Sequence, residues 1–386
     1  MNYHIAVQDK FMDSFIEDVY DLGLENNNVF WLRGEKGDSN HVQTTRAVAY
    51  IGENPTHIRN RFKQLQPDDR LFIHWYDTWM AELVFDLPNH ISVIAWGGEF
   101  FGEPILAHRH WLFDALTLDF ELRERKLNVV PRLNLLAWFK HVRRVQGVFR
   151  EANRQLERRQ THVARIDTLI LAEHNIGDLE KIKTLYPQCR AEHRPGFYDL
   201  NADLGASLPH IERDTTQPLK LLLGNSATST NNHLDAFQQL KSIPNLHIYC
   251  PLSYGNSNYR EHIITQGKAL FQDRFIPITQ FMSRSEYLTF LNSMDMVMMY
   301  HNRSQAFGNL ISALALGKLV LVKSQNSLHQ TFNALQLFHA PAEKIGQLPL
   351  ENLLEQAQSA KTSNQGLVQA AFSRSKRLHD WKNALQ

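Results

Sequence analysis

Short apolar runs separated by helical or polar stretches constrain the fold of this sequence more than any other feature. They fall at residues 3–7, 29–32, 47–51, 71–76, 91–96 and 167–172, and then at 219–223, 246–250, 275–278, 295–300 and 319–322. Runs of this length are typical of strands that are buried on both faces. Strands that alternate with longer segments form βαβ units. The sequence therefore predicts an α/β protein with parallel sheets.

The length of the chain predicts two domains. With 386 residues it exceeds one ordinary core, and domains of roughly 200 residues are the natural expectation. The stretch from Asn201 to Pro218 is rich in Gly, Ser, Pro and Thr and is typical of a linker. We expect Rossmann-like domains over residues 1–205 and 206–370 that face a cleft, with a last helix over 371–386 returning to the first domain.

Composition excludes several classes of protein. Hydrophobic residues make up 43%, charged residues 21%, and the formal net charge is +1, which argues against a dedicated nucleic-acid binder. Cys189 and Cys250 provide neither a disulfide framework nor a metal quartet, so a reducing cytoplasm is the simplest location. We find no signal-peptide pattern and no apolar run of the roughly 18 residues that a spanning helix needs, so any membrane contact should be peripheral.

The stretch from Leu219 to Leu240 predicts a strand, a loop of small residues and a helix. Gly224, Asn225 and Ser226 end the apolar run, and helical spacing begins near Asn231. Backbone N–H groups and short hydroxyls beside the positive end of a helix dipole can hold a phosphate or diphosphate. The alternative is an ordinary helix cap, because Ser, Thr and Asn cap helices for local reasons.

A second junction of this kind follows the run at residues 295–300. Gln305, Gly308 and Asn309 lead into an apolar helix that Gly317 ends, and this helix should start at the same sheet edge as the Gly224 loop. Two such helix N-termini suit a nucleoside diphosphate. The P-loop and dinucleotide fingerprints and any D-x-D motif are absent, so we expect no bound cofactor and no metal at the diphosphate.

In the first half, two predicted strands end in residues suited to chemistry. One runs into His74 and the other into Trp96-Gly97-Gly98-Glu99. Ligands of open α/β sheets gather beyond the carboxyl ends of strands. The two glycines would let a ligand approach closely, and Glu99 at the lip would be a general base, with His74 as the second candidate. The alternatives are a solvated loop carboxylate and a hydrogen-bonded histidine at a strand end.

A basic segment between these halves predicts contact with an anionic surface. Residues 132–165 carry nine Lys or Arg and two Glu, a net charge of +7, while the rest of the chain is net negative. Apolar residues such as Trp138 and Phe139 interleave with that charge, as in basic amphipathic helices on bilayers. The expected membrane-contacting residues are Arg143, Arg144, Arg150 and Arg154. The alternative is a solvated helix face.

Taken together, these motifs resemble the GT-B glycosyltransferases, and more closely the bacterial TDP-Fuc4NAc:lipid II transferases of enterobacterial common antigen synthesis. The resemblance is carried by Gly224-Asn225-Ser226 with His233, by Pro251 and Tyr254, by Gln305, Gly308 and Gly317, and by the Trp381 segment. Trp96-Gly97-Gly98-Glu99 is similar to a Trp-Gly-x-Asp element, and His74 to a strand-end histidine. Two residues depart from the pattern: Glu99 is one methylene longer than Asp, and Ser312 stands where many retaining GT-B enzymes carry a ribose-binding glutamate.

The resemblance implies a metal-independent hexosyltransferase. Its donor would be a nucleotide sugar, a TDP-linked Fuc4NAc-like deoxy-amino sugar, and its acceptor an undecaprenyl-diphosphate-linked oligosaccharide at the cytoplasmic face of the bacterial inner membrane. Gly224, Asn225, Ser226, Tyr254, Gln305, Gly308 and Asn309 would bind the donor. The alternatives are a sugar-nucleotide epimerase of the same fold and a non-catalytic sugar-nucleotide-binding protein. Inversion or retention of configuration stays open.

Overall fold

The computed structural model describes residues 1–9, 11–38, 42–102, 104–128, 135–199, 211, 213–347 and 349–386. The chain divides into two compact units: unit 1 comprises residues 1–107, 150–202 and 372–386, and unit 2 comprises 108–149 and 203–371. The division differs from our expectation in residues 108–149, which we had assigned to the N-terminal domain. The expected boundary at 205/206 and Arg132, the first residue of the basic segment, lie outside the described residues.

Within the residues that the structure describes, the sheet of unit 1 has seven parallel strands in the order β3-β2-β1-β4-β5-β6-β7. They are β1 (Asn2–Ala6), β2 (Asn28–Leu32), β3 (Ala49–Tyr50), β4 (Arg70–His74), β5 (His90–Ile94), β6 (Thr168–Leu171) and β7 (Glu192–Pro195). The chain runs outward from β1 on one side and from β4 on the other. The strand order therefore reverses between β1 and β4, which is where open α/β sheets bind ligands.

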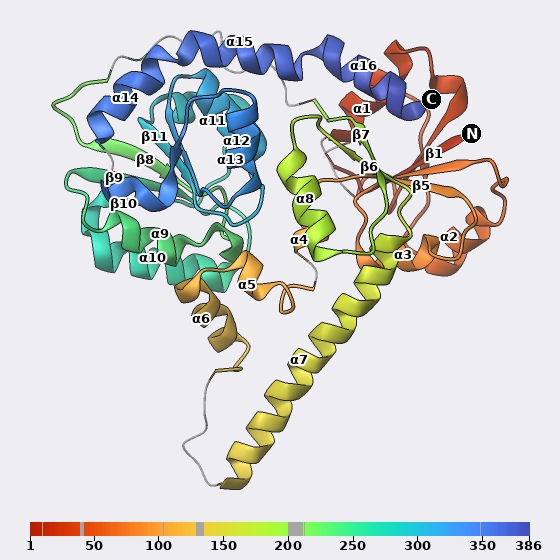
Figure 1. The fold of residues 1–386 in the computed structure, drawn as a ribbon, viewed down its shortest axis with the longest axis horizontal. Coiled ribbons are helices and arrows are strands. Elements are labelled where there is room, and N and C mark those ends of the chain that lie inside the picture. The colour runs from red at the N-terminus through yellow and green to blue at the C-terminus, as the bar shows by residue number, and fades with distance from the viewer. Residues whose placement is uncertain are drawn as a thin grey trace. The chain divides into compact units, whose positions relative to one another are not determined.

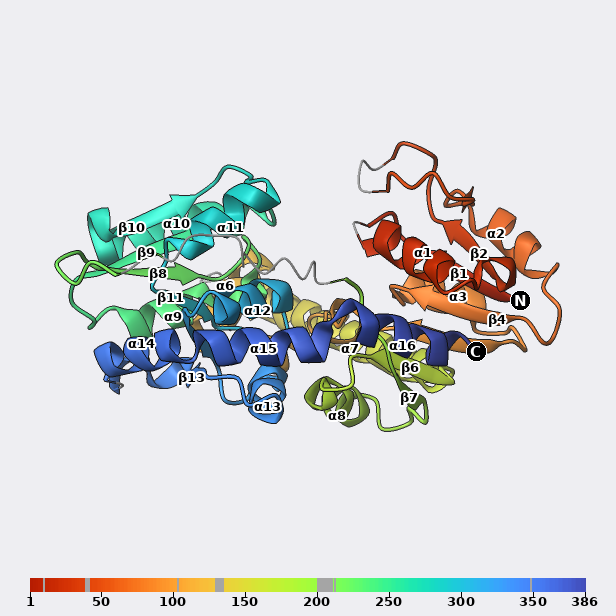
Figure 2. The ribbon, with the colours of Figure 1, turned by 90° about the horizontal axis from the view of Figure 1, so that it is seen from above.

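Helices cover both faces of this sheet (Figure 1). They are α1 (Phe11–Asp21), α2 (Pro55–Phe62), α3 (Thr78–Val84), α4 (Gly98–Phe101), the C-terminal part of α7 (Leu135–Ala164), α8 (Ile176–Leu185) and α16 (Arg374–Leu385), with the 3₁₀ helix η1 (Glu25–Asn27). Helices α1 and α16 lie side by side in both ribbon views (Figure 2). Trp381 of α16 is fully buried and packs edge-on against Phe15 of α1, with ring centroids 4.8 Å apart. The end of the chain is thus part of the core of unit 1.

In the described part of unit 2 the sheet has six parallel strands in the order β10-β9-β8-β11-β12-β13. They are β8 (Leu219–Leu223), β9 (Leu246–Pro251), β10 (Phe275–Ile278), β11 (Met296–Met299), β12 (Leu319–Val322) and β13 (Ala340–Pro341). Here the order reverses between β8 and β11. The ends of these two strands are the equivalent ligand-binding point of unit 2.

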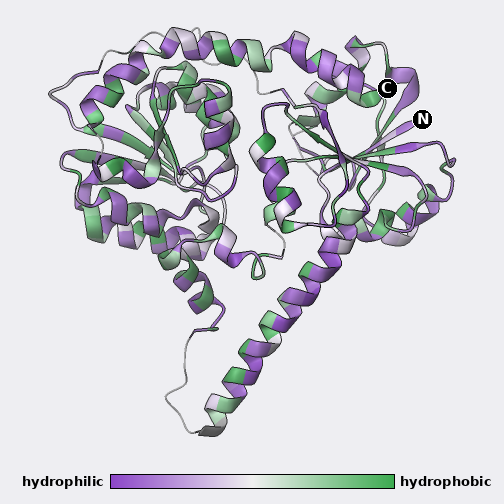
Figure 3. Ribbon diagram, viewed as in Figure 1, coloured by the Kyte–Doolittle hydropathy of each residue, from purple (hydrophilic) through white to green (hydrophobic). Residues whose placement is uncertain are grey.

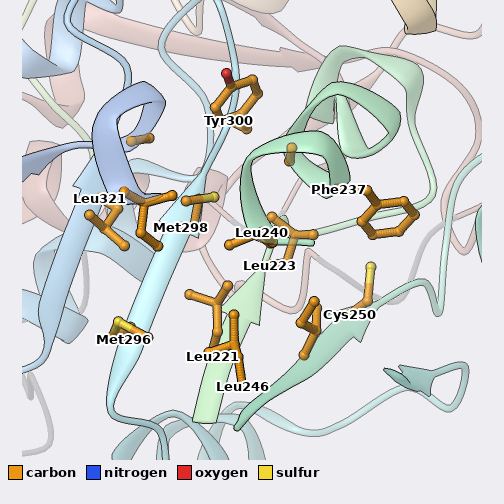
Figure 4. Close-up of a cluster of buried hydrophobic side chains, with 14 of the residues drawn as sticks. Leu221, Leu223, Phe237, Leu240, Leu246, Cys250, Met296, Met298, Tyr300 and Leu321 are labelled. Atoms are coloured by element: carbon orange, nitrogen blue, oxygen red, sulfur yellow. The ribbon is translucent and has the colours of Figure 1, made fainter. Parts of the chain in front are cut away.

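The helices of unit 2 pack an apolar core against the sheet. They are α5 (Arg109–Leu112), α6 (Ala115–Glu124), α9 (His233–Leu240), α10 (Ser257–Phe271), α11 (Arg284–Asn292), α12 (Phe307–Ala315), α13 (Ser327–Ala334), α14 (Leu350–Ser359) and α15 (Lys361–Phe372), with 3₁₀ helices η2 (Ser229–Asn231), η3 (Gln272–Arg274) and η4 (Ala342–Gln347). Figure 4 shows Leu221 and Leu223 of β8 meeting Phe237 and Leu240 of α9 within this core. Burial of such side chains contributes roughly 1.5–3 kcal/mol each.

The elements match the sequence closely. The expected strands 219–223, 275–278 and 319–322 are confirmed residue for residue as β8, β10 and β12. Helix α11 begins with a capping box: the Ser283 hydroxyl accepts the N–H of Glu286, and the Glu286 carboxylate accepts the N–H of Ser283. The strands β7 and β13 have no counterpart among the expected strands.

Candidate active site

The candidate donor site lies at the carboxyl ends of β8 and β11, the switch point of unit 2. Gly224 follows β8 directly, and its N–H donates to the carbonyl of Met298 in β11 at 2.9 Å. Its φ of +73° is favourable only for glycine, and an added Cβ would lie 2.5 Å from Nε2 of His233. The glycine therefore allows the chain to turn sharply at the strand end and to pass close to α9.

Three of the predicted donor-binding residues meet here in one hydrogen-bonded network. The amide of Asn225 donates to the hydroxyl of Tyr254 at 3.0 Å and accepts from Nε2 of Gln305 at 3.1 Å. Thr230 completes the link, because its hydroxyl donates to Oε1 of Gln305 at 3.0 Å. The network joins the loops after β8, β9 and β11, and the Tyr254 side of it is open, since that residue is 53% exposed.

The predicted residue Ser226 lies beneath this network rather than on its surface. It is fully buried, and its hydroxyl contacts the hydroxyl of Thr228 at 3.0 Å and accepts from the Asn231 amide at 3.2 Å. The Oδ1 of Asn231 in turn accepts the N–H of Asn225 at 2.9 Å. These buried bonds fix the backbone of the loop, so Ser226 positions the loop in this structure.

Gly308 and Asn309 lie in the first turn of α12, in agreement with the helix start expected from the sequence. The N-cap residue Ala306 has φ +58°, an uncommon conformation for a residue with a Cβ, and its carbonyl accepts the N–H groups of Asn309 and Leu310. An added Cβ at Gly308 would meet no atom within 4 Å. First-turn N–H groups of a helix have no i−4 carbonyl, so this open helix start can receive an anion. Ser312, the departure from the retaining pattern, bonds back to the Gly308 carbonyl at 2.9 Å.

The start of α9 is arranged differently from our expectation. We expected it near Asn231, facing a ligand, whereas α9 begins at His233 and its first turn holds the segment after α5. Oδ1 of Asn232 accepts the N–H of Asp114 at 2.9 Å, and the Asp235 carboxylate accepts the N–H groups of Leu116 and Thr117. Side chains of the Gly224 segment thus anchor the start of α6.

A buried ionic cluster lies at the end of β12, two positions along the sheet from Gly224. Nζ of Lys323 donates to both carboxylate oxygens of Asp114, at 2.8 and 2.6 Å, and also contacts Oδ1 of Asn302. Lys323 is only 5% exposed. Because a buried ammonium is costly without a partner, Asp114 and Lys323 hold the segment 112–117 against the sheet edge.

Two buried histidines lie close to the donor loop. His233 contacts the Tyr259 hydroxyl through Nδ1 at 3.2 Å, and burial lowers its pKa to about 3. Burial also lowers the pKa of His301 well below the usual value, with smaller contributions from the charges of Arg303, His233 and Lys323. Among the described residues neither ring nitrogen of His301 has a hydrogen-bond partner. Both rings are therefore neutral near pH 7.

In unit 1 the two predicted catalytic residues are buried. His74, at the end of β4, is 1% exposed; Nε2 contacts Nδ1 of His4 at 3.1 Å and Nδ1 contacts the Tyr198 hydroxyl. Burial and the neighbouring His4 lower its pKa well below the usual value. Glu99 does not sit at the lip of the sheet edge as expected: it is 1% exposed in α4, and Oε1 accepts the N–H of Trp96 at 2.7 Å.

Other residues at this edge of unit 1 were not predicted from the sequence. Arg33 follows β2 and forms an ion pair with Asp77, which follows β4, with Nη1 and Oδ2 2.9 Å apart. Trp75 lies between β4 and Asp77 with a φ of +83°. The only signal for them in the sequence was their place at strand ends, which does not reveal the pairing or the backbone strain.

The predicted membrane-contacting residues lie on one 30-residue helix, α7. Arg143, Arg144, Arg150 and Arg154 are all exposed. Figure 3 shows a mainly hydrophilic helix interrupted by hydrophobic positions. Among these, Trp138 is 41% and Phe139 57% exposed, and their rings form an edge-to-face pair with centroids 5.2 Å apart.

Neither a spanning helix nor a metal cluster is present in the described part of the chain. No helix there combines the length and apolar character needed to cross a bilayer. No group of three or more His, Cys, Asp or Glu residues is placed there to hold a metal ion.

Several solved structures are similar in fold to this chain. An α,α-trehalose-phosphate synthase (UDP-forming) from Burkholderia vietnamiensis is 10% identical, with 100% of this chain and 98% of that chain covered and a TM-score of 0.58. The E. coli trehalose-6-phosphate protein bound with UDP-2-fluoro glucose is 10% identical, covers 99% and 98%, and has a TM-score of 0.56. The N-terminal domain of Candida albicans trehalose-6-phosphate phosphatase is 8% identical, covers 99% and 96%, and has a TM-score of 0.59. At these identities the likeness concerns the fold.

Two Rossmann-like units with parallel sheets and these structural neighbours define the GT-B fold, which confirms the expected fold class. Residues 160–386 match the model of a more specific family, the 4-alpha-L-fucosyltransferases of glycosyl transferase group 56. The chain belongs to this family. The match covers all of β8 to α16, including the donor loop, Tyr254 and the start of α12. The protein is therefore a glycosyltransferase. Of the three functions considered from the sequence (a transferase, an epimerase and a non-catalytic binding protein), this family represents the transferase.

Proposed function

We propose that this protein transfers a Fuc4NAc-like deoxy-amino sugar from a TDP-linked donor to an undecaprenyl-diphosphate-linked oligosaccharide in the synthesis of a cell-envelope polysaccharide such as enterobacterial common antigen. The observation that carries the proposal is the network of Asn225, Tyr254 and Gln305 at the switch point of unit 2. The family description, a fucosyltransferase, supports a 6-deoxy sugar. The E. coli neighbour holds a nucleoside diphosphate sugar on the same fold, which supports this donor class.

In this proposal the diphosphate lies at the start of α12. The partial positive charge of a helix N-terminus stabilises the negative charge that develops on the leaving diphosphate. Gly308 leaves space beside the first-turn N–H groups, and Gln305, two residues before α12, is bonded to the Asn225 amide. We propose that these groups stabilise the leaving diphosphate without a metal ion.

The acceptor part of the proposal places the enzyme on the cytoplasmic face of the inner membrane. A polyprenyl-linked acceptor stays in the bilayer, so the enzyme must work at its surface. Exposed Trp138 and Phe139 provide apolar contacts at one end of α7, and the arginines that follow provide attraction to anionic lipids. These features support a peripheral association.

A donor screen by thermal stabilisation tests the proposal. A ligand that binds only the folded state raises the melting temperature, so nucleoside diphosphates and their sugars can be ranked without an acceptor. We expect TDP-sugars to stabilise the protein most. Asn225→Ala removes the bonds to Tyr254 and Gln305, and Gly308→Leu fills the start of α12, so each should weaken donor binding by roughly 10- to 100-fold.

The matched control is Gly346→Leu. Gly346 is an exposed glycine in η4 whose Cβ would have only ordinary contacts, the nearest at 3.8 Å. This variant should keep the melting temperature and the donor affinity of the wild type. Unchanged donor affinity in both Asn225→Ala and Gly308→Leu would show that the donor does not bind at this site in unit 2.

A further inference from the structure

The carboxyl edge of the unit 1 sheet carries a second group of side chains that the donor site does not use. The strand order reverses between β1 and β4, so this edge holds the switch point of unit 1. Trp75 and Asp77 follow β4, Arg33 follows β2, and Trp96 follows β5. All four are half-buried, so each presents part of its side chain to solvent.

An ion pair fixes the polar half of this group. The Arg33 and Asp77 side chains are 13% and 19% exposed, and Nη1 and Oδ2 are 2.9 Å apart. Oδ1 of Asp77 also accepts the N–H of Met80 at 2.7 Å, which caps α3, and the Arg33 guanidinium lies 4.2 Å above the ring of Trp79. A carboxylate has about four acceptor positions and a guanidinium five N–H groups, so both retain hydrogen-bonding capacity toward a ligand.

Two tryptophans form the apolar half. The rings of Trp75 and Trp96 lie edge to face with centroids 5.6 Å apart, and the indole N–H of Trp96 donates to the Tyr198 hydroxyl at 3.1 Å. The Trp75 ring covers Gly98 so closely that a Cβ there would lie 2.8 Å from it. Gly98 is the first residue of α4, so the tryptophan pair lies directly beside the turn that holds Glu99.

The backbone of Trp75 is strained. Its φ of +83° is an outlier for a bulky residue, which costs on the order of 1–3 kcal/mol and persists only where the surroundings over-determine it. Such strain concentrates at ligand sites. At this position it turns the Trp75 side chain onto Gly98, beside Trp96, at the end of β4.

We propose that Trp75, Trp96, Arg33 and Asp77 form a saccharide-binding subsite, which takes the acceptor sugar if the proposed function holds. The apolar C–H face of a pyranose packs on the indole rings, Asp77 accepts from one sugar hydroxyl, and Arg33 donates to another sugar oxygen. Because the Arg33 charge is balanced by Asp77, the subsite suits a polyhydroxyl ring better than a phosphate. This combination of apolar walls and few fixed polar groups is typical of small-ligand sites.

The seven tryptophans of the chain give a direct readout, because each contributes one indole N–H signal in a ¹⁵N-correlated NMR spectrum. The full-length protein is titrated with methyl glycosides of N-acetylhexosamines, hexoses and hexuronic acids. We expect at least one of these pyranosides to shift the signals of Trp75 and Trp96, assigned by substitution. Trp381, fully buried in the core, and Trp138, on α7, should stay unshifted.

Two substitutions at residue 75 separate the ring from the backbone. Trp75→Gly removes the ring and relieves the positive φ, whereas Trp75→Ala removes the ring and keeps the strain. Both should weaken pyranoside binding by about tenfold or more. Asp77→Asn should have the same effect, because it removes the charge that pairs with Arg33. Gln336→Gly, at an exposed residue of unit 2 with φ +56°, is the backbone control, and Phe281→Ala, at a ring that is 83% exposed, is the aromatic control. Neither control should change binding.

The outcomes separate this inference from the proposed function. Pyranoside shifts that disappear in Trp75→Gly support the subsite, whether or not nucleoside diphosphates bind. Failure of every pyranoside to shift Trp75 or Trp96, or shifts that survive both substitutions at residue 75, would overturn it. Stabilisation by a nucleoside diphosphate without any pyranoside shift would support the donor site and contradict only the saccharide subsite.

Discussion

Glu99 lies in the first turn of α4 with its carboxylate turned inward onto the N–H of Trp96, three residues back. This bond fixes the turn that leads into α4, and the Trp75 ring covers the neighbouring Gly98. Since the side chain is 1% exposed, an acceptor hydroxyl reaches it only after the turn at residues 96–99 opens. We propose Glu99 as the general base on this condition, with His74 as the competing candidate.

At the residue scale, Glu99→Gln tests that role. Glutamine keeps an Oε1 acceptor for the Trp96 N–H but carries no negative charge, so the fold and the donor affinity should persist. Loss of a general base lowers turnover by roughly 10²- to 10⁴-fold. Turnover is measured together with donor affinity and melting temperature, and His74→Ala serves as the comparison. Normal turnover in Glu99→Gln would leave the carboxylate with a structural role only, and loss of turnover in His74→Ala alone would assign the base to His74.

The strand–glycine–helix junctions of the candidate site could be predicted from the sequence, but the exposure of single residues could not. Gly224 and Gly308 could be predicted because strand, glycine and helix follow one another directly in the chain. The inward turn of Glu99 and the Arg33–Asp77 pair depend on three different strand ends meeting at one edge, which local spacing does not encode.

At the scale of elements, the strands that escaped prediction are edge strands. The residues of β7, Glu-His-Arg-Pro, are polar because β7 pairs on one side only, and β13 has two residues. Neither produces the apolar run that identifies a central strand. The segment 108–149 was misassigned for a related reason, because Asn232 and Asp235 attach it to unit 2 through contacts far apart in sequence.

Helix α7 supports a prediction at this scale. Each basic residue near an anionic surface contributes about 1 kcal/mol, screened by salt. Changing Arg143, Arg144, Arg150 and Arg154 to Glu should therefore release the protein from anionic vesicles in a sedimentation assay. The control has the same change of charge at exposed lysines elsewhere: Lys241, Lys268, Lys344 and Lys382 to Glu. Equal vesicle binding by both variants, or binding that does not change with salt, would show that the basic side chains of α7 form only a solvated helix face.

At the scale of the whole molecule, buried neutral histidines predict a loss of stability in mild acid. The unfolded histidine has a pKa near 6.5, whereas burial lowers the pKa of His4 to about 4 and that of His233 to about 3. Below pH 6.5 the unfolded chain binds protons that the folded chain does not. The free energy of unfolding therefore falls as the pH is lowered. Above pH 6.5 these groups contribute no pH dependence.

The size of this effect can be measured on one residue. Between pH 6.5 and 5 each such histidine should lower the free energy of unfolding by about 2 kcal/mol. His233→Phe removes one of them, so denaturant titrations of this variant should show a pH dependence smaller by about that amount. His57→Gln, at an exposed residue of α2, should keep the wild-type dependence. An unchanged dependence in His233→Phe would mean that the ring is not titrated on unfolding in this range.

The central claim, glycosyl transfer from a donor held at the switch point of unit 2, is tested most directly by release of nucleoside diphosphate. The purified protein is given a TDP-linked deoxy-amino sugar with and without a polyprenyl-diphosphate-linked saccharide, in the presence of EDTA. The account predicts release that requires the acceptor, continues in EDTA, and falls in Gly308→Leu but not in Gly346→Leu. Release at the same rate without the acceptor, or full activity in Gly308→Leu, would contradict it.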